Sequence, residues 1–559
     1  MFRVSFCIFV SLFILTITTN CSRKAVKSKA DVQHVAGQVI KFAPVTIQYD
    51  STLLDGNETK ALLKIVEAAQ YMDEIFLHQV YSRNAAIREE LMASTDAGDK
   101  PYKDLFTIMF GPFDRLDEDR PFINKDEKPA GANFYPEEMT KEDFNEWLEA
   151  HPEDRDAFEH TFTRIEEKNG KLIAVPYSEA YMQWLKPAAK LLKEAAKLTK
   201  NESLKNYLKS RADAFKSNDY YESDMDWMDL DSQIEVVIGP YEVYEDNLFN
   251  YKAAFEAFVT IVDPVSSHDL QIVGTHLDEL EKSLPAKDEY KNFNRGSESP
   301  VKVVQEVFSA GDTKAGVQTL AFNLPNDERV REAKGSKKVM LKNIAEAKFN
   351  KIYTPIAEIV LDEKMLSMVS FDRWFTHILM HEVTHGLGPG ILTLKDGSKT
   401  TVAKLLKDTY SAIEECKADV GGMYTFAYLC KKGIFPISLE KGIYPTYLAG
   451  IFRSVRFGAE EAHGRANMIA FNYISEKGGF VYDEDTEKFS VNDAKVRYAV
   501  SDLLNELLTL QAEGDYDRAV ALIEKYGEMP DHMKKVIGKL EELPVDIKPV
   551  FTVLDALAE

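Results

Sequence analysis

Cysteine is scarce in this sequence, and the few cysteines are poorly placed for disulfides. The 559 residues include 4 cysteines, too few for a disulfide framework. Cys7 and Cys21 lie close to the N-terminus, whereas Cys416 and Cys430 lie in a segment with a helical pattern. A helix rises ~1.5 Å per residue, which separates the latter two by roughly 20 Å on one straight helix. We therefore expect Cys416 and Cys430 to be packing residues.

Positive charge is also in short supply. Lys and Arg number 68 against 91 Asp and Glu, and the formal net charge is −23. Such a chain is a poor partner for nucleic acid, because its charge repels the phosphates. Apolar residues make up 45% and charged residues 28%, the profile of a globular protein. The length predicts about two to five domains, or one large two-lobed enzyme.

Long apolar runs are absent after the N-terminus. Residues 1–20 place one Arg before an apolar run from Val4 to about Ile17, the layout of a secretory signal. Cys21 follows, as in bacterial lipoprotein signals, where this cysteine is lipidated; plain secretion with cleavage nearby is the alternative. We expect residues 22–34 to form a short tether and the remaining chain to be soluble. The predicted location is the bacterial cell envelope, with the lipid as the only membrane contact.

The hydrophobic pattern predicts an α+β, helix-dominant fold with strands concentrated between about residues 234 and 325. The acidic stretch 218–231 holds six carboxylates and is interpreted as a solvated turn, because the glycine and terminal Glu of a calcium loop are missing. Helices are expected over 59–76, 177–217, 357–387, 402–430, 502–510 and 516–526, and extended segments over 301–307, 317–322, 479–491 (a hairpin) and 545–554.

The most specific signal is His381-Glu382-Val383-Thr384-His385. Two His at i and i+4 lie on one face of a helix and can share one Zn²⁺ through their ring nitrogens. Glu382 then faces the open metal position, where it can take a proton from water. A chain of this composition should contain roughly 0.02 such matches by chance. His377 is one turn too early to join the same ion, so we interpret it as a pocket or packing residue.

A catalytic zinc needs a third protein ligand. The segment Glu414-Glu415-Cys416-Lys417-Ala418-Asp419 lies in a second expected helix, and a Glu from it would complete a His₂Glu site. Neighbouring carboxylates can accept the outer N–H of the ligand imidazoles. Cys416 is the alternative ligand, but it points about 100° away from Glu415 on the helix.

Three further motifs occur in order around this pattern: Ile238-Gly239-Pro240-Tyr241-Glu242-Val243-Tyr244-Glu245-Asp246, Asn323-Leu324-Pro325-Asn326 and Ala462-His463-Gly464-Arg465. With them the chain, from roughly residue 130 onward, resembles the dipeptidyl peptidase III family of zinc peptidases. It looks most like the peptidase-like half of plant proteins that fuse this domain to a Nudix domain.

The resemblance implies a role for each motif residue. By this resemblance, one zinc ion is held by His381, His385 and Glu415, and Glu382 is the general base. Glu414 and Asp419 orient the ligand histidines, and Tyr244 and His463 donate to the oxyanion. Glu242, Asn323 and Asn326 hold the N-terminus and backbone of a bound peptide. Two departures bear on specificity. The HEVTH helix is one residue shorter than the HExxxH of many members, and C-terminal basic residues that grip the substrate carboxylate in longer members have no evident counterpart.

The resemblance also implies two lobes around a wide cleft, one mostly helical with the zinc site and one containing a β-barrel. The expected boundaries are 35–262, 307–355 and 541–559 for the barrel lobe, and 263–306 and 356–540 for the zinc lobe. The implied activity is zinc-dependent release of N-terminal dipeptides from oligopeptides. Two alternatives stay open: a lipid-anchored oligopeptide-binding protein with a non-catalytic zinc, and a peptidase of the same chemistry with another cleavage register.

Overall fold

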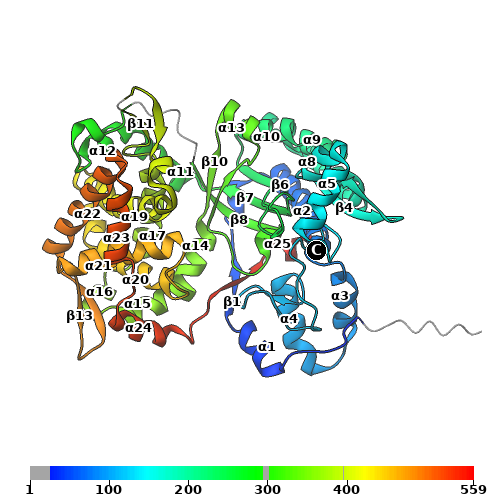
Figure 1. The fold of residues 1–559 in the computed structure, drawn as a ribbon, viewed down its shortest axis with the longest axis horizontal. Coiled ribbons are helices and arrows are strands. Elements are labelled where there is room, and N and C mark those ends of the chain that lie inside the picture. Colours follow the sequence, from blue (N-terminus) through cyan, green and yellow to red (C-terminus); the bar gives the residue numbers. More distant parts are fainter. Residues whose placement is uncertain (1–24, 294–300, 395, 559) are drawn as a thin grey trace, which may run out of the picture.

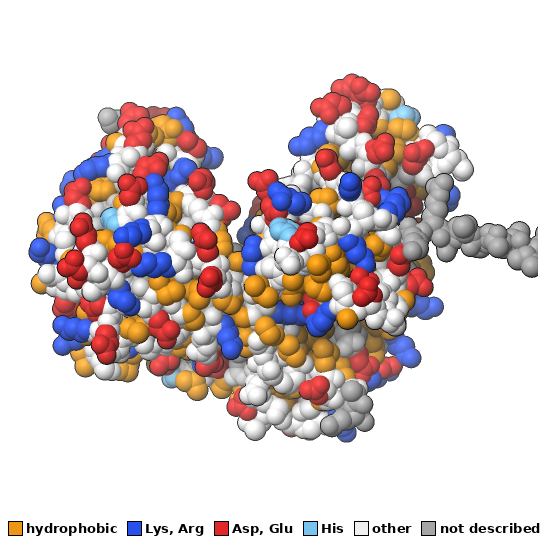
Figure 2. All heavy atoms as spheres, turned by 90° about the horizontal axis from the view of Figure 1, so that it is seen from below, with side chains coloured by type: hydrophobic (Ala, Val, Ile, Leu, Met, Phe, Trp, Pro, Cys, Tyr) orange, Lys and Arg blue, Asp and Glu red, His pale blue; other side chains and the backbone are white. Residues whose placement is uncertain are grey.

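The computed structural model describes residues 25–293, 301–394 and 396–558, so the expected signal segment and Cys21 lie outside the described residues. The chain forms two lobes (Figure 1), and the surface is hollowed between them (Figure 2). Helices dominate the described chain and strands concentrate in one lobe, which confirms the predicted fold class. No helix within the described ranges is both long and apolar enough to cross a membrane.

The first lobe is built on a five-stranded sheet with the order β6-β7-β8-β10-β9. β8 and β10 are parallel, and the other neighbours are antiparallel. Asn326 follows the outer strand β9, and Tyr241 follows the other outer strand, β6. The Asn326 side chain donates a hydrogen bond to Tyr241 O at 3.0 Å. The sheet therefore curves until the segments that follow its two outer strands meet, in the lobe where a barrel is expected. The strands are β6 Ile234–Pro240, β7 Phe255–Val262, β8 Val301–Gly311, β9 Ala321–Leu324 and β10 Lys337–Leu341.

Helices surround this sheet in the same lobe (Figure 1). α2 is the longest of those described here, and its buried stripe from Ala61 to Val80 packs against β7, β8 and α8. The principal helices of this lobe are α1 Val32–Val39, α2 Gly56–Val80, α3 Asn84–Ala93, α4 Lys100–Met109, α5 Lys141–Ala150, α8 Met182–Leu198, α9 Glu202–Ser217 and α10 Tyr221–Met228.

The second lobe is mainly helical, and its centre is the pair α17 Phe371–His385 and α19 Tyr410–Lys431. Two glycines let these helices approach closely. A Cβ on Gly421 would lie 2.5 Å from Thr384 Cγ2, and one on Gly422 would lie 3.0 Å from His381 N. Helix α14 (Lys342–Lys348) leads into this lobe and packs mainly against β8 of the first lobe. Around the pair lie α11 Pro264–Thr275, α12 Leu277–Ser283, α15 Thr354–Val360, α16 Glu363–Leu366, α20 Ile443–Val455, α21 Ala462–Glu476, α22 Asp493–Glu513, α23 Tyr516–Tyr526 and α24 Asp531–Ile537.

The chain returns from the second lobe to the first at its C-terminal end (Figure 1). β15 (Asp546–Phe551) pairs in parallel with β1 (Phe42–Ile47). The buried Asp546 carboxylate accepts from Lys348 Nζ at 2.9 Å. This strand therefore joins the last segment of the chain to the first lobe, and α25 (Val553–Ala558) follows it.

Most expected elements are present. The helix expected over 59–76 lies within α2, and the one expected over 402–430 is formed by α18 (Val402–Leu406) and α19. The helices expected over 502–510 and 516–526 lie within α22 and α23. The expected segment 177–217 contains α7 (Tyr177–Ala180), α8 and α9. The hairpin over 479–491 is β13 (Phe480–Asp483) and β14 (Lys488–Val491). Cys416 and Cys430 are buried free thiols, as predicted.

Four expectations were wrong in detail. Residues 218–231 contain helix α10 rather than a solvated turn, because Asp224 is buried against Arg211. Residues 357–387 form three helices, since the chain bends where Asp362 N donates to Phe489 O. The strand expected over 317–322 begins only at Ala321. The expected tether is docked from Ala25 onward.

Candidate active site

Helices α17 and α19 bring the three predicted zinc ligands together. His381 and His385 are one turn apart on α17, and their Nε2 atoms are 3.1 Å apart. Glu415 on α19 places Oε2 at 3.3 Å from His381 Nε2 and 3.8 Å from His385 Nε2. Ligand atoms about 2.0–2.2 Å from a tetrahedral zinc lie at comparable mutual distances.

The outer nitrogens of both imidazoles are occupied by carboxylates. His381 Nδ1 lies 2.7 Å from Asp419 Oδ1, and His385 Nδ1 lies 2.8 Å from Glu414 Oε1. A carboxylate accepts only, so Nδ1 carries the proton of each neutral ring, and the lone pair of that ring is on Nε2. Gln511 Nε2 donates to the second oxygen of Glu414 at 2.8 Å and holds that carboxylate in place. The geometry prepares both Nε2 atoms for a metal.

The cluster attracts positive charge. Burial alone would lower the pKa of His381, but the carboxylates of Asp419 and Glu415 outweigh burial and raise this pKa to about 10. Glu415 Oε2 is buried and makes no hydrogen bond, although imidazole nitrogens surround it. An oxygen in this situation is satisfied by a cation, so the side chains present fit a zinc ion.

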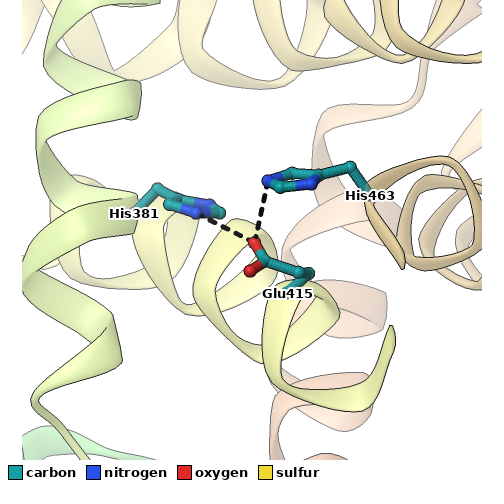
Figure 3. A group of neighbouring side chains, drawn as sticks. All are labelled: His381, Glu415 and His463. Atoms are coloured by element: carbon teal, nitrogen blue, oxygen red, sulfur yellow. Dashed lines mark ion pairs between the residues drawn. The ribbon is translucent and has the colours of Figure 1, made fainter. Parts of the chain in front are cut away.

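His463 lies beside the same cluster. Its Nε2 is 3.2 Å from Glu415 Oε2, and its ring is stacked with that of His381 at 6.4 Å between centroids (Figure 3). The ligand atoms of His381, Glu415 and His463 all lie within 4.8 Å of one another. Helix α21 therefore supplies a third imidazole at the site, and this side chain is 68% exposed. The family resemblance implies only an oxyanion-binding role for this histidine.

Glu382 faces a cavity of about 290 Å³ with His381, His385, Glu415 and Asn323. Its Oε2 accepts a hydrogen bond from Lys338 Nζ at 2.6 Å. Burial would raise the pKa of Glu382, but the Lys338 ammonium and the two imidazoles outweigh it and hold this pKa below its ordinary value.

Lys338 was not predicted from the sequence. It lies on β10 directly opposite Asn323 of β9, whereas Glu382 lies on α17. The pair therefore joins the two lobes across the cleft. A lone lysine in a strand gives no sequence signal for such a contact. Its position opposite Asn323, a predicted peptide-binding residue, depends on the strand pairing and is seen only in the structure.

The predicted peptide-binding residues Glu242, Asn323 and Asn326 and the predicted oxyanion donor Tyr244 do not all lie at the metal cavity. Asn323 lines the metal cavity, whereas Glu242, Asn326 and Tyr244 do not. Burial raises the pKa of Glu242, and a hydrogen bond from Asn326 partly opposes this rise. Tyr244 is 74% exposed, and its pKa is raised by the Glu242 charge. The structure therefore brings Glu242 and Asn326 together but leaves the Tyr244 hydroxyl away from the metal cavity.

Two further side chains behave as packing residues. His377 is buried and its Nε2 lies 3.0 Å from Asp419 O, so it contacts α19 rather than the metal cluster. Burial lowers its pKa, which favours the neutral ring. Burial also raises the pKa of the Cys416 thiol well above its ordinary value, so this cysteine is a poor rival for Glu415.

Comparison with known proteins gives a consistent result. The model of peptidase family M49 matches residues 134–404. Nudix hydrolase 3 of Arabidopsis thaliana is 40% identical, over 96% of this chain and 76% of its own length. Dipeptidyl peptidase 3 of Dictyostelium discoideum is 24% identical, over 62% of this chain and 57% of its own length.

Solved structures agree with these relatives. The structure of DPP III from Caldithrix abyssi is 58% identical, with a TM-score of 0.89 over 93% of this chain and 99% of that one. Dipeptidyl-peptidase III from Corallococcus sp. strain EGB is 42% identical, with a TM-score of 0.76 over 95% of this chain and 99% of that one. The resemblance seen in the motifs is thus confirmed, and the chain belongs to peptidase family M49, the dipeptidyl peptidase III family of metallopeptidases.

Proposed function

We propose that this metallopeptidase is a zinc enzyme that releases dipeptides from the N-terminus of oligopeptides. The main support is the convergence of His381 Nε2, His385 Nε2 and Glu415 Oε2 beside the Glu382 carboxylate. The Nδ1–H group of each histidine donates to a carboxylate. Peptidases of this family are zinc-dependent. His381, His385 and Glu415 would hold the zinc. When bound, this ion would act as a Lewis acid and would lower the pKa of a water molecule.

Glu382 acts as the general base. Its carboxylate lines the same cavity as the proposed ligands, so a water molecule there is within reach of its oxygens. Glu382 takes a proton from this water as the oxygen attacks the scissile carbonyl, and it later delivers the proton to the leaving amine. The Lys338 ammonium, 2.6 Å away, holds the resting Glu382 in its charged form.

Two donors are proposed to stabilise the oxyanion. His463 already lies beside Glu415, so its N–H can reach the cavity. The Tyr244 hydroxyl is exposed and would arrive only when the lobes close further around a substrate, which would also expel water. The lobe boundaries that we propose for this movement are those predicted from the sequence, except that all of β8 moves with the first lobe, because this strand belongs to the sheet of that lobe.

The dipeptide register is proposed from Glu242, Asn323 and Asn326. Glu242 is a carboxylate next to Asn326, a pairing that suits the ammonium of a free peptide N-terminus. A peptide added along the outer strand β9 would be held by backbone hydrogen bonds, which tolerate varied side chains. Two relatives are named dipeptidyl peptidase 3, which supports this register over others.

The test is a peptide library incubated with zinc-loaded protein, with the products identified by mass spectrometry. We expect N-terminal dipeptides from the wild type and none from Glu382→Gln, which should keep its zinc. Intact peptides together with stoichiometric zinc would favour the oligopeptide-binding alternative. Single residues or internal fragments would show another register, and hydrolysis by Glu382→Gln at the wild-type rate would refute the role of Glu382.

We also propose that the protein is lipid-anchored through Cys21 in the bacterial cell envelope. The support is the signal-like segment 1–20 and the cysteine that follows it. Mass spectrometry of the N-terminal peptide from the membrane fraction should show a diacylglyceryl cysteine. Cys21→Ser should release the protein from membranes, and its retention there would contradict the anchor.

A further inference from the structure

A second compartment of the cleft adjoins the metal cavity. It has a volume of about 580 Å³, within the ~300–1,000 Å³ typical of ligand pockets. Three side chains line both spaces: Lys338, Glu382 and His385. A peptide lying across the metal cavity therefore has direct access to this compartment.

Walls from both lobes form the compartment. Strands β7 and β8 contribute Val262 and Val301, and α17 contributes Val383. Helix α11 presents Ser267, Leu270, Gln271 and Gly274, which lie on one helical face, and Leu277 begins α12. Five of these side chains are aliphatic, so the compartment offers an apolar surface immediately beside the reacting groups.

Both lysines of the compartment already have partners, and its Asp231 is exposed. Lys302 Nζ contacts Glu235 Oε2 at 2.6 Å and Leu230 O at 2.8 Å. Lys338 is paired with Glu382. An acidic ligand group could contact these lysines only by breaking one of their pairs, whereas an apolar group gains burial against the aliphatic walls.

We infer that this compartment binds a large apolar side chain of the peptide on the C-terminal side of the scissile bond, an inference that rests on the proposed peptidase function. The assignment to the C-terminal side of the scissile bond follows from the residues that line the metal cavity and the compartment. Of the three residues assigned to the N-terminal part of the peptide, only Asn323 lines the metal cavity, and none lines this compartment. The segment that follows the scissile bond is left to occupy it.

Gly274 makes the inference testable by substitution. It lies in the regular helix α11, and a Cβ added there meets no atom within 4 Å. Leucine also has a higher helix propensity than glycine. The Gly274→Leu side chain should therefore fill part of the compartment without disturbing the fold. Gly37 of α1, in the other lobe, has the same open surroundings, so Gly37→Leu is the matched control.

The experiment compares peptides that differ only in the residue after the cleaved bond: Ala, Leu, Phe or Asp. For the wild type and Gly37→Leu we expect kcat/KM for Leu and Phe to exceed that for Ala by about 10- to 100-fold, as for other apolar pockets. In Gly274→Leu this ratio should collapse toward one. A ratio cancels the active fraction of each preparation, so incomplete folding or zinc loading cannot imitate the effect.

Two results would overturn the inference: a wild type that does not prefer Leu and Phe, or a Gly274→Leu variant that keeps the full preference. Either result still shows hydrolysis and leaves the proposed function standing. Absence of zinc-dependent hydrolysis of every peptide would instead refute the proposed function.

Discussion

Removal of the Lys338 ammonium is the perturbation whose effect the structure defines best. Lys338 Nζ donates to Glu382 Oε2 at 2.6 Å, and both side chains are about three-quarters buried. The ammonium holds the pKa of Glu382 below its ordinary value. Lys338→Met keeps much of the side-chain volume but removes the charge, so the pKa of Glu382 should rise.

The size of the expected rise in the pKa of Glu382 follows from the charged hydrogen bond that is lost. A hydrogen bond to a charged group contributes about 1.5–3 kcal/mol, and ~1.4 kcal/mol corresponds to a tenfold change in an equilibrium constant. Only the unprotonated carboxylate can serve as a base. A raised pKa therefore moves the acidic limb of the pH profile of kcat/KM to higher pH. At a pH on that limb, activity should fall by about 10- to 100-fold.

The assay measures kcat/KM for a cleaved peptide between pH 5 and 9. At a pH well above the limb, the variant should lose much less activity than it loses on the limb. Lys302→Met is the matched control, because Lys302 lines the neighbouring compartment but pairs with Glu235; its acidic limb should not move. An acidic limb of Lys338→Met that superimposes on the wild-type limb would refute the assignment of this pair.

Three other perturbations test contacts that hold the site and the two lobes together. Asp419→Asn removes the carboxylate from His381 Nδ1 and should weaken zinc binding by about 10- to 100-fold in chelator competition; unchanged affinity would contradict the orienting role. Gly422→Val places its Cβ against the backbone of α17 and should destabilise the protein by about 1–3 kcal/mol in thermal denaturation; an unchanged Tm would show that α19 can move away freely. Lys348→Met leaves the buried Asp546 carboxylate without a counter-charge and should cost about 3–5 kcal/mol in urea unfolding. The double variant with Asp546→Asn should recover part of this loss, because its amide oxygen can still accept from Gln318 N. Equal stability of the single variant and the wild type would contradict the buried pair.

The sequence predicted the parts of the site that depend on short-range spacing. His381, Glu382 and His385 lie within five residues, so helical periodicity alone places them together. Glu415 is 30 positions further on, and it was found because a catalytic zinc requires a third ligand from another element. The structure brings these side chains together through the close packing of α17 and α19 at Gly421 and Gly422, which no local pattern reveals.

Contacts between distant segments account for what was missed. Asp224 appeared solvated because its partner Arg211 lies on another helix. The break after α15 depends on the contact of Asp362 with Phe489 of β14. Lys338 reaches Glu382 from the other lobe. In each case the tertiary partner, rather than the local propensity, decides the structure.

We propose that one zinc ion is held by His381, His385 and Glu415. Anomalous diffraction from crystals of the zinc-loaded protein, measured on both sides of the zinc absorption edge, would locate this ion. We predict one strong peak about 2.0–2.2 Å from both Nε2 atoms and from the Glu415 carboxylate. A peak held by His463 in place of His385, or no peak at this cluster, would contradict the claim.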